Sequence, residues 1–198
     1  MKLTTRLLLI WPLLITFIFS GCSQGALKSE RKIIDEQWSQ ILVKYQARSD
    51  LFSIVLEELD GNLKTDVNLI KSASNLNKEF SLTQRMTDIQ TNTASMIKFM
   101  QDEKKLTEEF SLILLDLKKN NYYQESLLID LSNEIYQADH EISKMKLKYA
   151  SSVQKFNLLT QMFPNNIFKL FGVSHELPFT PLIKDQETTS MLIQQRPI

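Results

Sequence analysis

Residues 131–163 read LSNEIYQADHEISKMKLKYASSVQKFNLLTQMF, and mostly apolar side chains recur in this stretch at alternating spacings of four and three. The recurring positions are Leu131, Ile135, Ala138, Ile142, Met145, Tyr149, Ser152, Phe156, Leu159 and Phe163. This spacing places the side chains on one face of an α-helix of roughly 50 Å. Pro164 follows directly and cannot continue the hydrogen-bond ladder, so the sequence predicts that the helix ends there.

The stretch from Ile34 to Leu59 has the same spacing and predicts a second long helix. Its recurring positions are Ile34, Trp38, Ile41, Tyr45, Arg48, Phe52, Val55 and Leu59. Arg48 is the exception, because the spacing predicts an apolar side chain at that position. Gly61, just beyond the stretch, is compatible with either a helix end or a kink.

The periodicity is weaker between these two helices. Helical spacing continues through residues 63–70 and again through residues 82–100, and we expect a break near residues 77–81. A shorter amphipathic segment spans residues 106–117. It ends at residues 118–121, where two lysines suit a helix C-terminus and two asparagines suit a turn.

No part of the chain alternates apolar and polar residues for long enough to predict a strand. The expected fold is therefore all-α, an up-and-down bundle of four long amphipathic helices joined by short connections. The alternative is a parallel dimeric coiled coil, which needs charges of matched sign at the e and g positions. The scattered charges of this chain favour the bundle.

The composition excludes several functional classes. The chain has 198 residues, 43% of them hydrophobic, with 23 basic and 23 acidic side chains, which fits one domain and lacks the basic excess of a nucleic-acid binder. None of its four glycines has the spacing of a phosphate-binding loop. One cysteine and two histidines exclude a zinc cluster or an intrachain disulfide, and no cofactor is expected.

The amino terminus has the layout of a signal peptide. Lys2 and Arg6 precede an apolar run over residues 7–19, which is short for a stable transmembrane helix. Residues 19–22, Phe-Ser-Gly-Cys, resemble the lipobox that is cleaved before a lipidated cysteine, so Cys22 is the expected site of acylation, including palmitate. The alternative is an inner-membrane protein that keeps residues 7–19 as an uncleaved anchor.

Four regions follow from these patterns. Residues 1–21 are the expected signal peptide, residues 22–30 a lipidated cysteine and short tether, and residues 31–172 the helical bundle. Residues 173–198 form a proline-containing tail that we expect to be flexible. The alternative for this tail is that its apolar residues fold back over the end of the bundle; they are Leu177, Phe179, Leu182 and Ile183.

Residues 34–179 resemble the LemA family of membrane-associated bacterial helical proteins. The resemblance rests on two groups of motifs: Gln37-Trp38-Ser39-Gln40 with Tyr45-Gln46-Ala47-Arg48-Ser49-Asp50-Leu51, and Tyr149, Val153, Phe156-Asn157 with Phe163-Pro164-Asn165-Asn166 and Phe171-Gly172. Departures, such as Ala150 where the family has asparagine, mark a divergent member. The resemblance implies a four-helix up-and-down bundle and supplies no catalytic mechanism.

Arg48 is the polar residue that most needs an explanation. A guanidinium directed into a core requires carboxylate or carbonyl partners, and Asp139 and Glu134 on the last helix are candidates. The LemA pattern has a glutamate at the position aligned with Asp139, so the resemblance favours an Arg48–Asp139 pair. We interpret the pair as a structural one that fixes helix register. The alternatives are a polar site inside the bundle and a solvent-facing Arg48.

The other residues that could carry chemistry have simpler interpretations. His140 adjoins Asp139, but neighbours on a helix point about 100° apart, so a surface histidine is expected rather than a catalytic dyad. Charged groups interpreted as solvated helix faces are Glu57-Glu58, Asp60, Asp102-Glu103, Glu108-Glu109 and the lysines Lys144, Lys146 and Lys148. Methionines interpreted as core filling, with an adaptable binding surface as the alternative, are Met86, Met96 and Met100.

The sequence therefore predicts a non-enzymatic, membrane-tethered interaction or scaffold protein of the bacterial envelope. It would reach the membrane through the lipid on Cys22 and bind protein partners, with no nucleic acid. Ser23 in place of aspartate resembles the signal that sends lipoproteins to the outer membrane, if the host is Gram-negative.

Overall fold

The computed structural model describes residues 2–60, 66–119, 126–162 and 177, with side chains from residue 25 onward and not at residues 126–128. These residues form four helices: α1 (Lys2–Asp60), α2 (Val67–Thr83), α3 (Thr93–Lys119) and α4 (Ser126–Gln161). No strand occurs among them. The prediction of an all-α bundle of four helices is confirmed.

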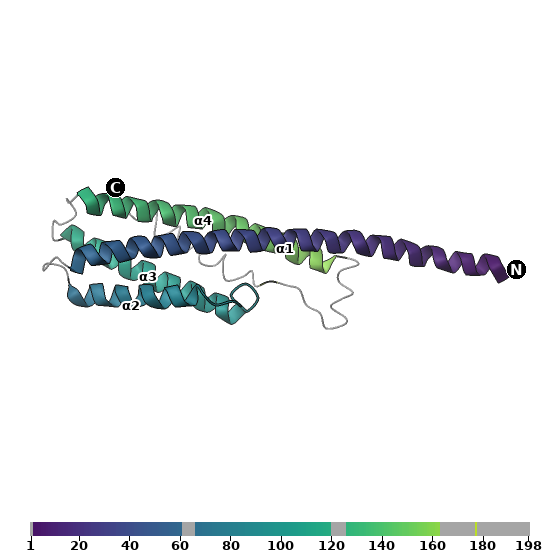
Figure 1. Ribbon diagram of the computed structural model, residues 1–198, viewed down its shortest axis with the longest axis horizontal. Helices are drawn as coiled ribbons and strands as arrows, with labels where there is room; N and C mark the ends of the chain where they lie inside the picture. Colours follow the sequence, from purple (N-terminus) through teal and green to yellow (C-terminus); the bar gives the residue numbers. More distant parts are fainter. Residues whose placement is uncertain (1, 61–65, 120–125, 163–176, 178–198) are drawn as a thin grey trace.

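Successive helices run in opposite directions, as expected for an up-and-down bundle (Figure 1). Helix α1 packs along α4, while α2 and α3 pair as a hairpin and α2 also contacts α1. The first part of α1 extends well beyond the other three helices (Figure 1). Gly61 and Phe163 lie outside the described residues.

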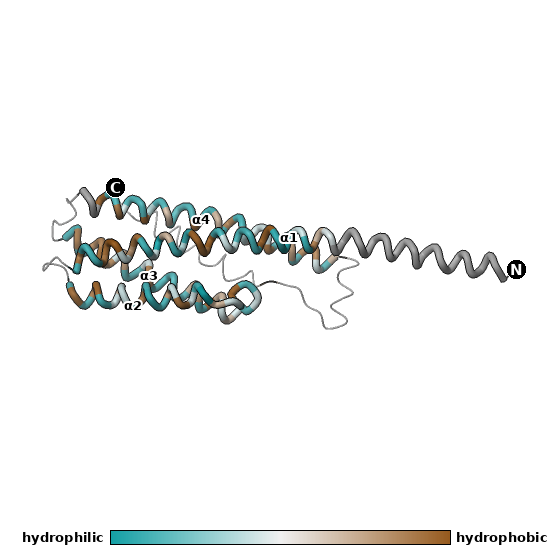
Figure 2. Tube along the Cα trace, viewed as in Figure 1, coloured by the Kyte–Doolittle hydropathy of each residue, from teal (hydrophilic) through white to brown (hydrophobic). Residues whose placement is uncertain are grey.

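The core contains most of the apolar positions that the periodicity singled out, whereas Val67 and Leu82 are exposed. Polar and apolar residues alternate along the coloured parts of the helices (Figure 2). Aromatic rings connect the helices. Trp38 of α1 contacts Phe99 of α3 and Tyr149 of α4, with ring centroids 5.4 and 5.3 Å apart. Phe52 of α1 stacks on Phe110 of α3 at 4.0 Å. Such contacts add to the free energy gained by burying the rings.

The N-termini of α2 and α3 are capped by side chains. The Asp66 carboxylate accepts a hydrogen bond of 2.9 Å from the backbone N–H of Asn68 at the start of α2. The Asn92 side-chain oxygen accepts one of 2.9 Å from the N–H of Ala94 at the start of α3. Each cap satisfies a donor that the helix itself leaves unpaired.

The expected break near residues 77–81 is wrong, because α2 continues through this stretch to Thr83. Asn77 is 6% exposed there, and α1 supplies partners for its amide. The chain turns instead over residues 84–92, after which α3 runs without interruption through the segment expected to start at residue 106.

Candidate functional site

Arg48 lies in the core between three helices, with 1% of its surface exposed. Its Nη1 donates to Asp139 Oδ1 of α4 at 2.6 Å, and to Glu103 Oε1 and Thr107 Oγ1 of α3 at 3.2 and 3.4 Å. We call these four residues the buried ion cluster. It joins α1, α3 and α4 at one level of the bundle.

Aromatic rings surround the other side of the guanidinium. The Arg48 Cζ atom lies 5.0, 5.3 and 5.9 Å from the ring centroids of Tyr45, Phe52 and Phe80. Its Nε and Nη2 atoms are buried without a hydrogen-bond partner. The electron-rich ring faces therefore supply part of the attraction that holds the cation on this side.

The cluster perturbs the titration of its members and neighbours. Burial alone would lower the pKa of Arg48, but the charges of Asp139 and Glu103 outweigh it and raise the pKa, so the guanidinium stays charged. Burial, with the nearby charge of Glu103, raises the pKa of the Tyr45 hydroxyl to about 12. Neither group can exchange a proton near neutral pH, which argues against an acid–base role.

A second set of polar contacts ties α2 to α1. The Asn77 amide donates to the backbone oxygen of Ser49 and to Ser53 Oγ, both at 3.0 Å. The side chain of Gln84 donates to Ser49 Oγ at 3.4 Å.

A third set ties α2 to α3. Thr83 Oγ1 donates to Asp102 Oδ2 at 2.7 Å, and Lys98 Nζ donates to the same oxygen at 2.7 Å. Burial acts to raise the pKa of Asp102, but these two hydrogen bonds and the charge of Lys98 lower it overall.

The structure brings together Arg48 and Asp139, the two residues that the sequence analysis pairs, and leaves Glu134 exposed. It adds Glu103, which the sequence analysis missed. Glu103 follows Phe99 by four residues and precedes Leu106 by three, so the spacing itself marks it as a core position.

Three charged residues expected on solvated helix faces lie inside the bundle. Asp102 is 7% exposed and Glu103 pairs with Arg48, so their assignment to a solvated face is wrong. Lys146 is 8% exposed, which also contradicts a solvated face.

Met96 and Met100 are buried in the core, as predicted. His140 is exposed, as expected. Cys22 lies within α1 but outside the residues whose side chains are described.

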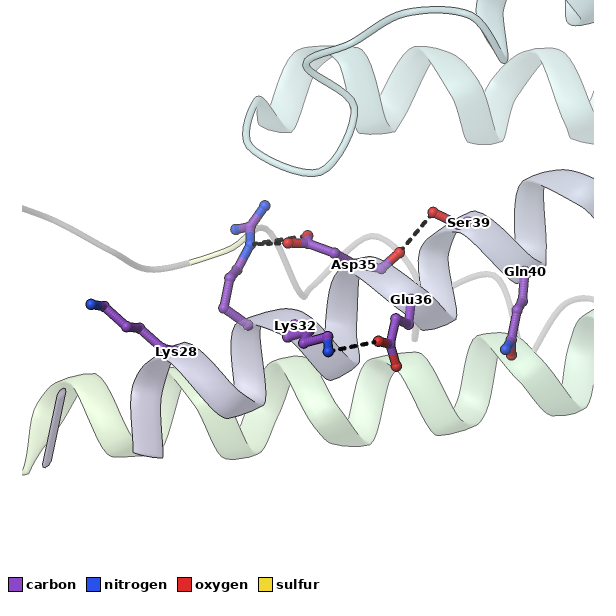
Figure 3. Close-up of a pocket in the computed structure, with 7 residues that line it drawn as sticks. Lys28, Lys32, Asp35, Glu36, Ser39 and Gln40 are labelled. Carbon is purple, nitrogen blue, oxygen red and sulfur yellow. Dashed lines mark hydrogen bonds and ion pairs between the residues drawn. The ribbon is translucent and has the colours of Figure 1, made fainter. Parts of the chain in front are cut away.

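A shallow pocket of about 570 Å³ opens along one face of α1 (Figure 3). It is lined by Lys28, Arg31, Lys32, Asp35, Glu36, Ser39 and Gln40. Four of its charges pair along the helix, Arg31 with Asp35 at 3.0 Å and Lys32 with Glu36 at 3.7 Å. Exposed pairs of this kind are weak and strongly hydrated, so this face does not form a chemically defined site.

Over the described parts of the chain, no three or more His, Cys, Asp or Glu side chains are placed to hold a metal ion. Within the same parts, no helix is both long enough and apolar enough to span a membrane.

A comparison with protein families finds one match, to the model described as LemA family, over residues 37–192. No curated protein and no solved structure matches the chain. The family match covers all of α2, α3 and α4, most of the core part of α1, and the whole buried ion cluster.

Proposed function

Because the chain belongs to the LemA family, we propose that it is a lipid-anchored, non-enzymatic interaction or scaffold protein of the bacterial cell envelope. The observation that carries this proposal is that the buried charged groups pair with one another. Arg48 contacts Glu103 and Asp139 within the bundle, so the charged groups of the core hold helices together instead of facing a substrate pocket.

The path of α1 supports tethering at Cys22. The helix runs from Lys2 to Asp60, so Cys22 and the core lie on one continuous element. Ile34 is the first fully buried core residue among those whose side chains are described. The twelve residues from Cys22 to Ile34 span about 18 Å of helix at 1.5 Å per residue. An acylated Cys22 would therefore hold the bundle close to the membrane surface on a helical stem.

The continuity of α1 is equally compatible with a second candidate, an inner-membrane protein that retains residues 7–19 as its anchor. The two candidates differ in the covalent state of Cys22. A lipoprotein loses residues 1–21 and gains acyl chains on Cys22, whereas an anchored protein keeps its full length and an unmodified thiol.

Intact mass of the protein extracted from host membranes distinguishes these candidates. We expect a chain that begins at Cys22 and carries acyl chains, and we expect Cys22→Ala to abolish both cleavage and acylation. Gly25→Ala is the matched control, because a Cβ at this position meets no atom within 4 Å and should leave processing intact. A full-length, unmodified mass would refute lipidation and establish the retained anchor.

The outer face of α4 offers a surface for protein partners. Tyr136, Leu147 and Leu158 are 49%, 54% and 52% exposed. They recur every eleven residues, three turns of helix, and each step drifts by only about 20° around the axis. The three side chains therefore form one apolar line along a helix whose other exposed positions are mostly polar.

Cross-linking in whole cells tests the interaction role. Leu147→Glu should abolish partner cross-links made along α4 while the bundle stays folded. Gln137→Glu adds the same charge to the same helix, about 80° away from Leu147, and should leave them unchanged. Equal cross-linking of both variants and the unsubstituted protein would exclude this face as the interaction surface.

A further inference from the structure

Asn157 near the end of α4 makes two hydrogen bonds to the backbone of one residue far along the chain. Its Nδ2 donates to the carbonyl oxygen of Leu177 at 3.0 Å, and its Oδ1 accepts from the N–H of Leu177 at 2.9 Å. Leu177 is 6% exposed and belongs to the same hydrophobic cluster as Ile34, Val153 and Phe156. The contact thus combines backbone pairing with burial of an apolar side chain.

The chemistry of this contact matches an extended backbone. In an extended residue the N–H and C=O point to the same side, as in a β ladder where one residue exchanges both bonds with the residue opposite. A carboxamide presents one donor and one acceptor side by side, so Asn157 substitutes for that opposite residue. Pro178 follows Leu177 and restricts it to extended conformations, which prepares it for this pairing.

We propose that Asn157 and the adjoining core form a docking site on α4 that recognises an extended backbone with a leucine side chain, and that Leu177 of this chain is its resident ligand. Because both hydrogen bonds go to the backbone of the bound residue, the site selects for an extended backbone and one apolar side chain. It does not read the side chains of a longer sequence motif. Docking holds Leu177 against the end of α4.

The docking site lies at the end of the bundle where α1 leads toward Cys22. Lys155, two residues before Asn157, forms an ion pair with Glu30 of α1. If the protein is tethered at Cys22, which rests on the proposed function, the docked Leu177 lies near the membrane-facing end of the bundle. The docking itself does not require the lipid, so a Cys22→Ala chain should dock its Leu177 equally well. A failure of docking and a failure of lipidation are therefore distinguishable.

Residue-resolved hydrogen exchange of the full chain, uniformly labelled with ¹⁵N, tests the proposal directly. The Leu177 amide should exchange at least about tenfold more slowly than the same amide in an unstructured peptide, since two hydrogen bonds must open first. Asn157→Ala should remove this protection. Gln154→Ala changes an exposed position one turn earlier on the same helix and should leave it unchanged.

A second variant guards against loss of the fold. Leu177→Asp lies outside the four helices and should remove the protection by making burial of the side chain costly, while the helix amides of α4 remain protected. Leu177→Ile retains the backbone groups and an apolar side chain, so protection should persist. The proposal is overturned if the Leu177 amide of the unsubstituted chain exchanges at the unstructured rate, or if its protection survives Asn157→Ala.

Discussion

Arg48 is the side chain on which three helices converge, and it is the residue whose loss should cost most. Arg48→Ala leaves Glu103 and Asp139 without their cation. Their side chains are 16% and 33% exposed, so water can reach them in part. We expect a loss near the low end of about 3 to 5 kcal/mol in the free energy of unfolding. Urea denaturation measures it, and an unchanged midpoint would rule out a structural role for the pair.

Two further variants separate the ion cluster from ordinary surface charge. Lys44→Ala removes the exposed partner of Glu141, a pair 2.6 Å apart, and should change stability very little because solvent screens it. Replacing the cluster as a unit, with Arg48→Met, Glu103→Leu and Asp139→Asn, should recover most of the stability lost in Arg48→Ala, because no buried charge is then left unpaired.

Tyr45 gives a prediction about alkaline pH. Its hydroxyl is buried without a hydrogen-bond partner, and its pKa is raised to about 12 from an ordinary value of 10.0. The unfolded chain therefore loses this proton first as the pH rises. The contribution of Tyr45 to the free energy of unfolding is complete below pH 10 and is lost between pH 10 and pH 12, by roughly 2 to 3 kcal/mol. Burial also raises the pKa of Tyr149 to about 12, so Tyr45 accounts for part of the decline at alkaline pH.

Tyr45→Phe should leave the free energy of unfolding at pH 7 unchanged or slightly higher, since no hydrogen bond is lost, and it should make the decline above pH 10 smaller. Chemical denaturation at a series of pH values gives both quantities. Parallel curves for the two proteins above pH 10 would contradict the assignment.

At the scale of the elements, side-chain hydrogen bonds tie α2 to both α1 and α3. Asn77 joins it to Ser49 and Ser53 of α1. Asn77→Ala should lower the free energy of unfolding by about 1 to 3 kcal/mol. Lys78→Ala alters the adjacent exposed position and should have little effect. If both variants share one urea midpoint, the Asn77 contacts do not stabilise α2.

The elements that the sequence predicts well are those with an uninterrupted apolar face. The core part of α1 and nearly all of α4 follow from spacing alone, because burial of the recurring side chains dominates their stability. The boundary between α2 and α3 does not, because its core positions are polar. Asn77 indicates a break until its partners on α1 are known. Glu103, within α3, occupies a position that the apolar spacing marks as core, but its charge indicates a surface position until Arg48 is placed beside it.

The candidate site likewise contains residues that the local sequence pattern predicts and residues that only the packing of the helices reveals. Arg48 is conspicuous in the sequence because it interrupts an apolar face, and the resemblance to LemA proteins adds Asp139. Tyr45 and Phe52 lie one turn before and one turn after Arg48 on α1, whereas Phe80 and Thr107 depend on how α2 and α3 pack. Contacts between residues on different helices leave no periodic signal in the chain.

At the scale of the whole molecule, the bundle should keep its stability when the helical stem between Cys22 and Ile34 is interrupted. Gly25 is exposed and lies nine residues before Ile34, which is buried in the core. Gly25→Pro should interrupt α1 there without changing the melting temperature of the bundle. The same substitution at the exposed Gln46, within the bundle, should unfold the protein. Circular dichroism melts compare them, and a large drop for Gly25→Pro would show that the stem contributes to the fold.

The antiparallel packing of α1 along α4 also determines how the molecule would bear a mechanical load. A pull on the N-terminal end of α1 acts along the helix axis, parallel to the interface with α4. The interface is then loaded in shear, so its contacts, the Arg48–Asp139 pair among them, share the force instead of separating one after another. If the lipid anchor holds the amino terminus and a partner binds α4, tension between the two loads the α1–α4 interface in shear, the direction in which this interface is strongest.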